Sequence, residues 1–120
     1  MKGINKSLKN PEAIPAGGWW ICTPRTNSKL ADWIKLFGYF EDLAVTNNSD
    51  QTVTAYAGIG DDDFITVTGS RMLCLIGNTM FDRFRIHNDG DSEIEAGKII
   101  VTLSKDFEGK EEGNISREWI

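Results

Sequence analysis

From residue 51 onward, apolar and polar residues alternate with a period of two. Successive side chains of a strand point to opposite faces of a sheet, so this alternation is typical of half-buried β-strands. The strongest runs are rich in β-branched and aromatic residues, and they cover residues 51–56, 64–68, 71–76, 82–86 and 98–103. Segments of Gly, Asn and Asp that favour turns separate them. Short strands about 8 to 12 residues apart with tight turns predict an antiparallel sandwich or barrel rather than parallel βαβ units.

Residues 83–96 allow a prediction of strand register. If 89–91 form a three-residue loop, Ile86 faces Ile94 on the apolar side of a hairpin. The same register makes every other facing pair complementary: Phe84 with Ala96, Arg85 with Glu95, and His87 with Glu93. A two-residue loop would place an isoleucine opposite a glutamate, so the sequence predicts the longer loop.

The first half of the chain has a different pattern. Its apolar residues recur at helical spacing: Leu30, Trp33, Ile34 and Phe37. Ser28 is a suitable N-cap for this helix, and Gly38 is a suitable residue to end it. The apolar runs at 17–22 and 43–46 predict a strand on either side of the helix.

Together these patterns predict a mainly β fold: an antiparallel β-sandwich, jelly-roll or immunoglobulin-like, with one short helix near residues 28–37. The sandwich domain is expected to span residues 17–106. Residues 1–16 hold too few apolar groups for a core of their own, and we expect an N-terminal arm there. Residues 107–120 are acidic and contain glycine, which predicts a C-terminal tail.

Composition and charge exclude several classes of function. The 120 residues include 13 Lys and Arg against 18 Asp and Glu, and this length suffices to bury one core without metal or disulfide support. Residues 1–60 hold six basic and five acidic side chains, a balance of +1, whereas residues 61–120 hold seven and thirteen, a balance of −6. A nucleic-acid binder needs a basic face, so we expect no direct nucleic-acid binding. The apolar runs are too short for a signal peptide or a membrane span.

Both cysteines, Cys22 and Cys74, sit beside apolar residues, which predicts two buried, unbridged thiols. With a single histidine, they cannot form a zinc site of the usual spacing. Without a signal peptide we expect a reducing compartment, where disulfides are rare.

Few residues suggest catalysis or cofactor binding. His87 is the only histidine, and the predicted pairing with Glu93 explains it without an active site. The acidic runs at 61–63 and 89–93 suggest calcium, but neither has the alternating ligand spacing of a helix-loop-helix site. Acidic turns that keep a sheet soluble are the favoured explanation. The chain also lacks a complete dinucleotide fingerprint and a phosphate loop, so no cofactor is expected.

The tryptophans and the N-terminal lysines are the candidate partner-binding residues. Trp33 belongs to the apolar stripe of the helix, which predicts a core position. Trp19 and Trp20 are adjacent on a predicted strand and must point to opposite faces, so both faces are covered or one ring is left for a partner. Aromatic residues are enriched at protein interfaces and in sugar-binding platforms. The candidates are Lys2, Lys6, Lys9, Trp19, Trp20 and Trp119.

Residues 84–101, FRIHNDGDSEIEAGKIIV, follow Thr-rich strands and a Gly-Ser turn. In this succession of Thr-rich strands and short polar turns, the chain resembles the small β-sandwich structural proteins of tailed bacteriophages, such as capsid decoration, head-fibre and tail-adaptor domains. The resemblance extends over residues 43–104. It implies a virion component, made in the host cytoplasm, that self-associates and docks on other virion proteins. It implies no individual functional residues.

The first hypothesis is therefore a non-enzymatic structural or assembly subunit of a virion, a homo-oligomer that docks through its terminal arms. The alternative is a carbohydrate-binding module, with Trp19 or Trp20 and Tyr56 stacking on sugar rings. The third hypothesis is a small acid–base enzyme that uses His87 and Glu93. A soluble cytoplasmic location is the alternative to the virion, and no membrane partner is expected.

Overall fold

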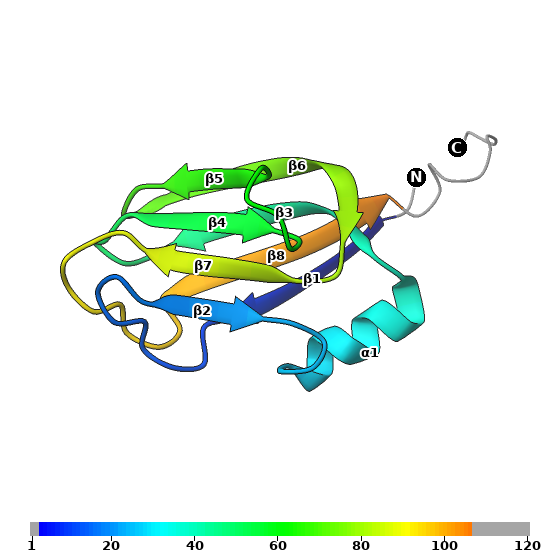
Figure 1. The fold of residues 1–120 in the computed structure, drawn as a ribbon, viewed down its shortest axis with the longest axis horizontal. Helices are drawn as coiled ribbons and strands as arrows, with labels where there is room; N and C mark the ends of the chain where they lie inside the picture. The colour runs from blue at the N-terminus through cyan, green and yellow to red at the C-terminus, as the bar shows by residue number, and fades with distance from the viewer. Residues whose placement is uncertain (1–2, 107–120) are drawn as a thin grey trace.

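The computed structural model describes residues 3–106, with the exception of the side chains at 75–79 and 106. This part of the chain forms eight strands and one helix (Figure 1). In chain order they are β1 (Gly3–Lys9), β2 (Trp19–Cys22), α1 (Ser28–Phe37), β3 (Phe40–Asn47), β4 (Val53–Ala57), β5 (Phe64–Val67), β6 (Arg71–Phe81), β7 (Phe84–Asn88) and β8 (Ile99–Asp106).

The strands form two four-stranded antiparallel sheets that stack as a sandwich (Figure 1). The first sheet has the order β1-β8-β3-β6 and the second β2-β7-β4-β5. Four strand pairs are nested within one another: β1 with β8, β2 with β7, β3 with β6, and β4 with β5. One long antiparallel ribbon rolled into two sheets is the jelly-roll topology. The predicted sandwich with one short helix is confirmed, and the strand order selects the jelly roll over the immunoglobulin-like arrangement.

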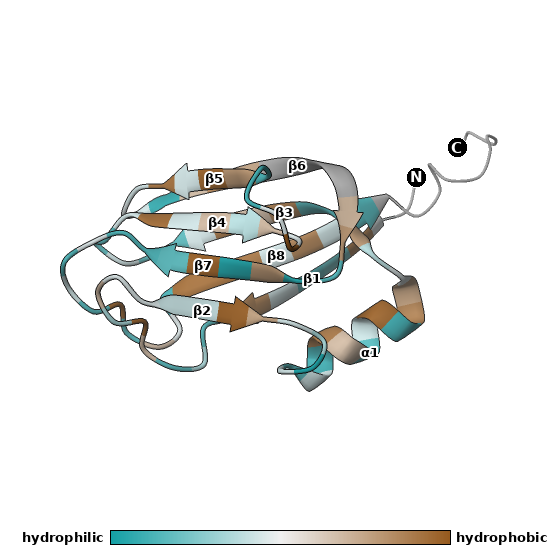
Figure 2. Cartoon of the chain, in the orientation of Figure 1, coloured by the Kyte–Doolittle hydropathy of each residue, from teal (hydrophilic) through white to brown (hydrophobic). Residues whose placement is uncertain are grey.

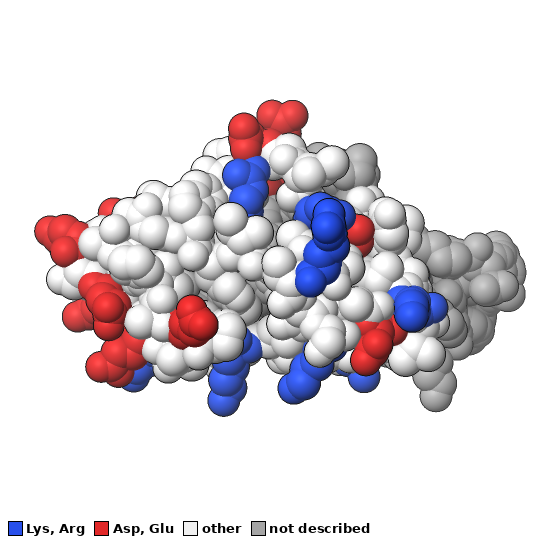
Figure 3. All heavy atoms as spheres, turned by 60° about the horizontal axis from the view of Figure 1, so that its bottom comes forward, with Lys and Arg blue, Asp and Glu red and all other residues white. Residues whose placement is uncertain are grey.

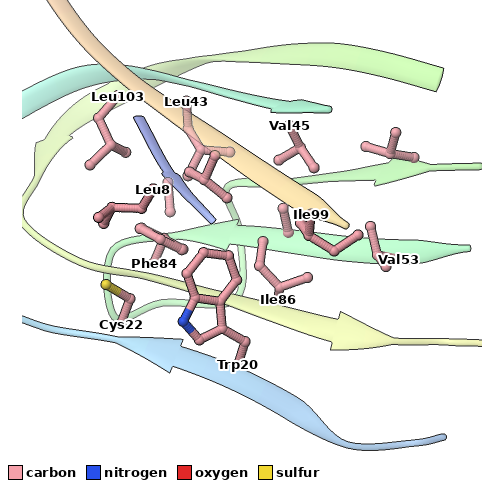
Figure 4. Close-up of a cluster of buried hydrophobic side chains, with 14 of the residues drawn as sticks. Leu8, Trp20, Cys22, Leu43, Val45, Val53, Phe84, Ile86, Ile99 and Leu103 are labelled. Atoms are coloured by element: carbon pink, nitrogen blue, oxygen red, sulfur yellow. The ribbon is translucent and has the colours of Figure 1, made fainter. Parts of the chain in front are cut away.

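The core lies between the two sheets. In β4, Val53, Ala55 and Ala57 are buried and the residues between them are half-exposed, as the period of two predicts. Large buried side chains come from both sheets: Leu43 and Val45 of β3, Ile99 and Leu103 of β8, and Phe84 and Ile86 of β7. Figure 4 shows the β3 and β8 side chains pointing toward those of β7 and β2. The same alternation appears as brown and teal bands along the strands in Figure 2.

The first strand corrects the predicted domain boundary. Residues 3–9 are not a separate arm, because β1 pairs with β8 from Gly3 opposite Asp106 to Lys9 opposite Ile100. Leu8 is buried in the core, and the Ser7 and Thr102 hydroxyl oxygens lie 2.8 Å apart. The segment has too few apolar groups to fold alone, but the open edge of β8 supplies its backbone partners. The predicted tail at 107–120 lies outside the described residues.

The predicted hairpin within 83–96 is wrong. In the structure β7 lies between β2 and β4, and Ile86 is opposite Trp20 on one side and Ala55 on the other. Ile94 instead forms an isolated bridge with Ile14, with N–O distances of 2.9 and 2.8 Å in the two directions. The facing pairs predicted from that register therefore do not arise. The complementary side chains within 83–96 suggested a hairpin. In the structure, Ile86 and Ile94 are both buried, and each pairs with a segment that is distant in sequence.

Three buried asparagines hold the loops at one end of the sandwich. The Asn88 amide nitrogen donates to the carbonyl oxygens of Ile14, Pro15 and Ser92. Asn47 donates to the carbonyl oxygens of Gln51 and Val67 at 2.7 and 3.0 Å. Asn10 donates to those of Glu12 and Glu95 and accepts from the backbone N–H of Ile99. These side chains satisfy backbone groups that the strands leave unpaired where the chain turns.

The helix forms where its pattern predicts it, with a different N-cap. The Asn27 side chain, not that of Ser28, accepts the backbone N–H of Leu30 at 2.9 Å. At the other end Gly38 adopts a φ of 82°, which glycine tolerates, and its N–H donates to the Ile34 carbonyl.

The helix α1 covers one end of the sandwich, and the loops held by Asn10, Asn47 and Asn88 lie at the opposite end (Figure 1). Leu30 is fully buried, and Trp33 and Ile34 are half-buried against the core. The ammonium of Lys105, a buried side chain of β8, donates to the Phe37 carbonyl oxygen at 2.6 Å. A cation at the C-terminus of a helix also interacts favourably with the helix dipole. This contact attaches the helix to the first sheet.

The two cysteines have different environments, so the prediction of two buried thiols holds for one only. Both are unbridged. Cys22 is buried, and desolvation raises the pKa of its thiol to about 12. Cys74 is exposed on β6, opposite Ala44, because that position points outward from the sheet edge. Its pKa is also raised, first by partial desolvation and then by the Asp42 carboxylate.

Replacing Leu8 with Ala should lower the free energy of unfolding by about 2 to 4 kcal/mol, because it opens a cavity under β1. Lys9→Ala, at the exposed neighbouring position, is the matched control and should change it by no more than about 0.5 kcal/mol. Chemical denaturation of the full chain measures both. Equal effects of the two substitutions would show that the segment is a free arm after all.

At about pH 8, a thiol reagent such as dithionitrobenzoate should modify only the exposed Cys74 in the native protein. The buried Cys22 should react only after unfolding. Asp42→Asn should speed the native reaction, because removing the carboxylate lowers the pKa of the Cys74 thiol and increases its thiolate fraction. Absorbance after rapid mixing measures both the number of thiols and the rate. Reaction of both cysteines at the same rate without denaturant would contradict the assignment.

Candidate functional site

The outer surface of the second sheet carries an aromatic face. Trp19 and Trp20 point to opposite sides of β2, as predicted: Trp20 is buried, whereas Trp19 is 43% exposed. Trp20 meets Phe84 edge-on, with ring centroids 5.1 Å apart, so it is a core residue. Of these two adjacent tryptophans, only Trp19 is accessible to a partner.

Strand register aligns the outward side chains in two rows across the sheet. One row contains Ile21, Arg85, Tyr56 and Phe64, from β2, β7, β4 and β5 in turn. The other contains Trp19, His87, Thr54 and Thr66. We call these two rows the aromatic face. They bring together residues more than sixty positions apart in the chain, which the sequence pattern alone does not reveal.

The rings of the aromatic face touch one another around a single cation. The Tyr56 ring centroid lies 5.8 Å from that of Trp19 and 5.7 Å from that of Phe64. The Arg85 guanidinium carbon lies 4.5 Å from the Tyr56 centroid and 5.5 Å from the Trp19 centroid. Attraction between a cation and ring faces fixes the orientation of the arginine side chain.

Arg85 also contacts the loop that follows β4. Its Nη2 donates to the Gly60 carbonyl oxygen at 2.8 Å and to Asp61 Oδ1 at 2.6 Å. The Asp61 side chain is 82% exposed, whereas that of Arg85 is 24% exposed. The ion pair therefore lies at the edge of the aromatic face, with the carboxylate on its outer side.

His87 supports the Trp19 ring. The two ring centroids are 4.6 Å apart. Nδ1 lies 2.5 Å from Asp89 Oδ1 and Nε2 lies 3.2 Å from the Gly17 carbonyl oxygen, which accepts hydrogen bonds only. The Thr54 hydroxyl donates to the other Asp89 oxygen at 2.5 Å. The partner of His87 is thus Asp89 and not the predicted Glu93, and the imidazole is held as a positioning group.

A hollow of 280 Å³ lies next to Arg85 on the same sheet. It is lined by Ile21, Thr23, Gly58, Ile59, Arg83, Phe84 and Arg85. Ile21 and Ile59 are 56% and 84% exposed. The Arg83 guanidinium pairs with the adjacent Asp82 at 2.9 Å, and that hydrogen bond raises the pKa of Arg83. The hollow therefore combines apolar walls with two cationic groups.

The other candidates lie elsewhere. Lys6 is half-buried, with its ammonium 5.4 Å from the Phe37 ring centroid, and Lys9 is exposed at the end of β1. Neither belongs to the aromatic face. Lys2 and Trp119 lie outside the described residues. Arg85, Ile21 and Phe64 were not singled out from the sequence, although their outward positions follow from the alternation within their strands.

Charge is divided along the molecule. Acidic side chains gather at the loop end, remote from α1 (Figure 3). Exposed carboxylates there come from Glu12, Asp50, Asp91, Glu93 and Glu95. Within residues 3–106, no group of three His, Cys, Asp or Glu side chains could hold a metal ion. In that same range, no helix has the length and apolar character to cross a membrane.

Comparison with known proteins finds distant structural similarity only. No protein-family model matches the chain, and no curated protein sequence gives a significant match. The tobacco streak virus coat protein is 11% identical, with a TM-score of 0.41, 85% of this chain covered and 83% of that one. A Yersinia pseudotuberculosis-derived mitogen is 11% identical, with a TM-score of 0.36, 98% of this chain covered and 97% of that one.

The capsular polysaccharide assembling protein CapF from Staphylococcus aureus is 15% identical, with a TM-score of 0.38 and 88% of this chain covered. The present chain spans 24% of the length of CapF. These matches assign no role, and the surface chemistry of the two-sheet antiparallel sandwich is the basis for a function.

Proposed function

We propose that the protein is a non-enzymatic structural or assembly subunit, most specifically a virion component, which associates with a second copy of itself through the aromatic face. The observation that carries this proposal is the cluster formed by the exposed Trp19 ring with the half-buried Tyr56 and Arg85 on an open sheet surface. The resemblance to small phage structural proteins in sequence texture agrees with this role.

The composition of the aromatic face supports a protein partner. Tryptophan, tyrosine and arginine are the residues most enriched at the centres of protein interfaces, where a few side chains carry most of the binding free energy. Here they are surrounded by exposed apolar side chains, with Ile21 at 56% and Phe64 at 50% exposure. Covering these groups with another subunit would remove apolar area from water while the Arg85 guanidinium stays stacked on the rings.

Carbohydrate binding is the second candidate, and Trp19 and Tyr56 favour it. Both rings are on one face, beside the Thr54 hydroxyl and the Asp89 carboxylate. Sugars stack on open ring faces, however, and the Arg85 guanidinium lies over both rings. A protein surface that packs around the stacked cation suits this arrangement better.

Trp19→Ala should shift the protein toward monomer by at least about tenfold in dissociation constant, as loss of a central aromatic residue does at other interfaces. Leu36→Ala is the control, because Leu36 is a 71% exposed apolar side chain on α1, away from the aromatic face. Light scattering across a concentration series measures both. A wild-type chain that stays monomeric throughout, or equal effects of the two variants, would contradict the proposal.

His87→Gln should leave the protein folded and associating, because a glutamine amide can still donate to the Gly17 carbonyl and the lost contacts contribute about 1 kcal/mol. Thermal melting and light scattering provide the two readouts. A folded variant that loses all biological function would instead indicate that the imidazole performs acid–base chemistry.

A further inference from the structure

The hydrogen bonds that Arg85 makes to described residues use one of its three guanidinium nitrogens, and its side chain is 24% exposed. An arginine carries five N–H donors, and those that Arg85 directs to residues of the described chain both come from Nη2. Stacking on Tyr56 and Trp19 holds the group in place independently of these bonds. A second acceptor could therefore reach a guanidinium that is already oriented.

Asp61 is a replaceable partner for this guanidinium. Its side chain is 82% exposed, on a loop that contains Gly58 and Gly60. Exposed ion pairs contribute little to stability, because water solvates both charges and the carboxylate loses conformational freedom in the pair. A carboxylate delivered together with buried apolar surface would compete well against it, since desolvation strengthens the charge interaction.

The adjoining hollow determines which carboxylates fit. The exposed Ile21 and Ile59 side chains form apolar walls next to Arg85, and the space of 280 Å³ accommodates a large side chain. A carboxylate at Arg85 and an apolar group in the hollow would then belong to neighbouring residues of one segment.

We propose that this site binds a carboxylate adjacent to a large apolar side chain, which displaces Asp61, and that the bound segment is Glu118-Trp119-Ile120 of a second copy. This inference rests on the proposed self-association and names its contact. Glu118 would pair with Arg85, while Trp119 or Ile120 would fill the hollow.

Chain length and charge favour this segment. Glu118 lies twelve positions beyond Asp106, and an extended chain advances roughly 3.3 Å per residue, so the segment can reach about 40 Å from the end of β8. That reach exceeds the two shorter dimensions of the molecule, 27 and 24 Å, so the segment is long enough to contact a subunit that lies alongside. Glu118 is followed directly by two large apolar residues, which matches the order of cation and hollow.

Asp61→Asn in the full chain should strengthen self-association about threefold or more, because it removes the competing carboxylate. Asp62→Asn is the matched control: it makes the same charge change on the same loop, and Asp62 does not line the hollow beside Arg85. Sedimentation or light scattering gives the dissociation constants, and thermal melting verifies that both variants are folded. Equal effects of the two variants, or weaker association of Asp61→Asn, would overturn the proposal.

Glu118→Gln should weaken association about tenfold, whereas Glu112→Gln in the same segment should change it by less than about twofold. Combined with Arg85→Met, the effect of Glu118→Gln should disappear, because the two residues form one contact. Additive effects would overturn the pairing. A chain that associates and depends on Trp19, yet is indifferent to Glu118 and Asp61, contradicts this inference alone. A chain that is always monomeric contradicts the proposed function as well.

Discussion

The position of β7 between β2 and β4 is the constraint on which the rest of the structure depends. Its inward residues, Phe84 and Ile86, are almost completely buried and join the second sheet to the core. Its outward residues, Arg85 and His87, are placed by the same backbone against Tyr56 and Trp19. Because side chains alternate strictly along a strand, a one-residue shift would bury the cation and expose the isoleucine. Core packing and surface chemistry are therefore set by one register.

The ends of the sandwich keep that register in place. At one end, Asn88 terminates β7 and ties it to the segment that precedes β2 through the Ile14 and Pro15 carbonyls. Buried amide groups with satisfied hydrogen bonds specify a single arrangement, because any other leaves polar atoms unpaired in the core. At the other end, Lys105 bonds the last turn of α1. The aromatic face is consequently built on strands whose ends are held by hydrogen bonds, which would limit the entropy lost if the proposed partner binds.

In the proposed assembly, Arg85 is the residue that would serve both the free subunit and the associated one. Its pairing with the exposed Asp61 keeps a stacked cation hydrogen-bonded while the sheet faces water. A jelly roll has open sheet faces and edges, so an assembling subunit needs surfaces that are stable alone yet receptive to a neighbour. A replaceable ion pair over aromatic rings meets both needs. The acidic side chains at the loop end would repel the same end of a second copy, which would favour one relative orientation in the proposed assembly.

The sequence by itself determined the helix over 28–37, most strands from residue 17 onward, and the alternation of inward and outward side chains in strands such as β4 and β7, because these depend on local periodicity. It identified Trp19 as a surface candidate only as one of two adjacent tryptophans. Tertiary structure decided that residues 3–9 join a sheet, that Ile94 pairs with Ile14, and that Arg85 stacks on Tyr56. Strand partners in a jelly roll are distant in sequence, and several registers give complementary pairs of facing side chains. The register that forms is the one that buries the whole core.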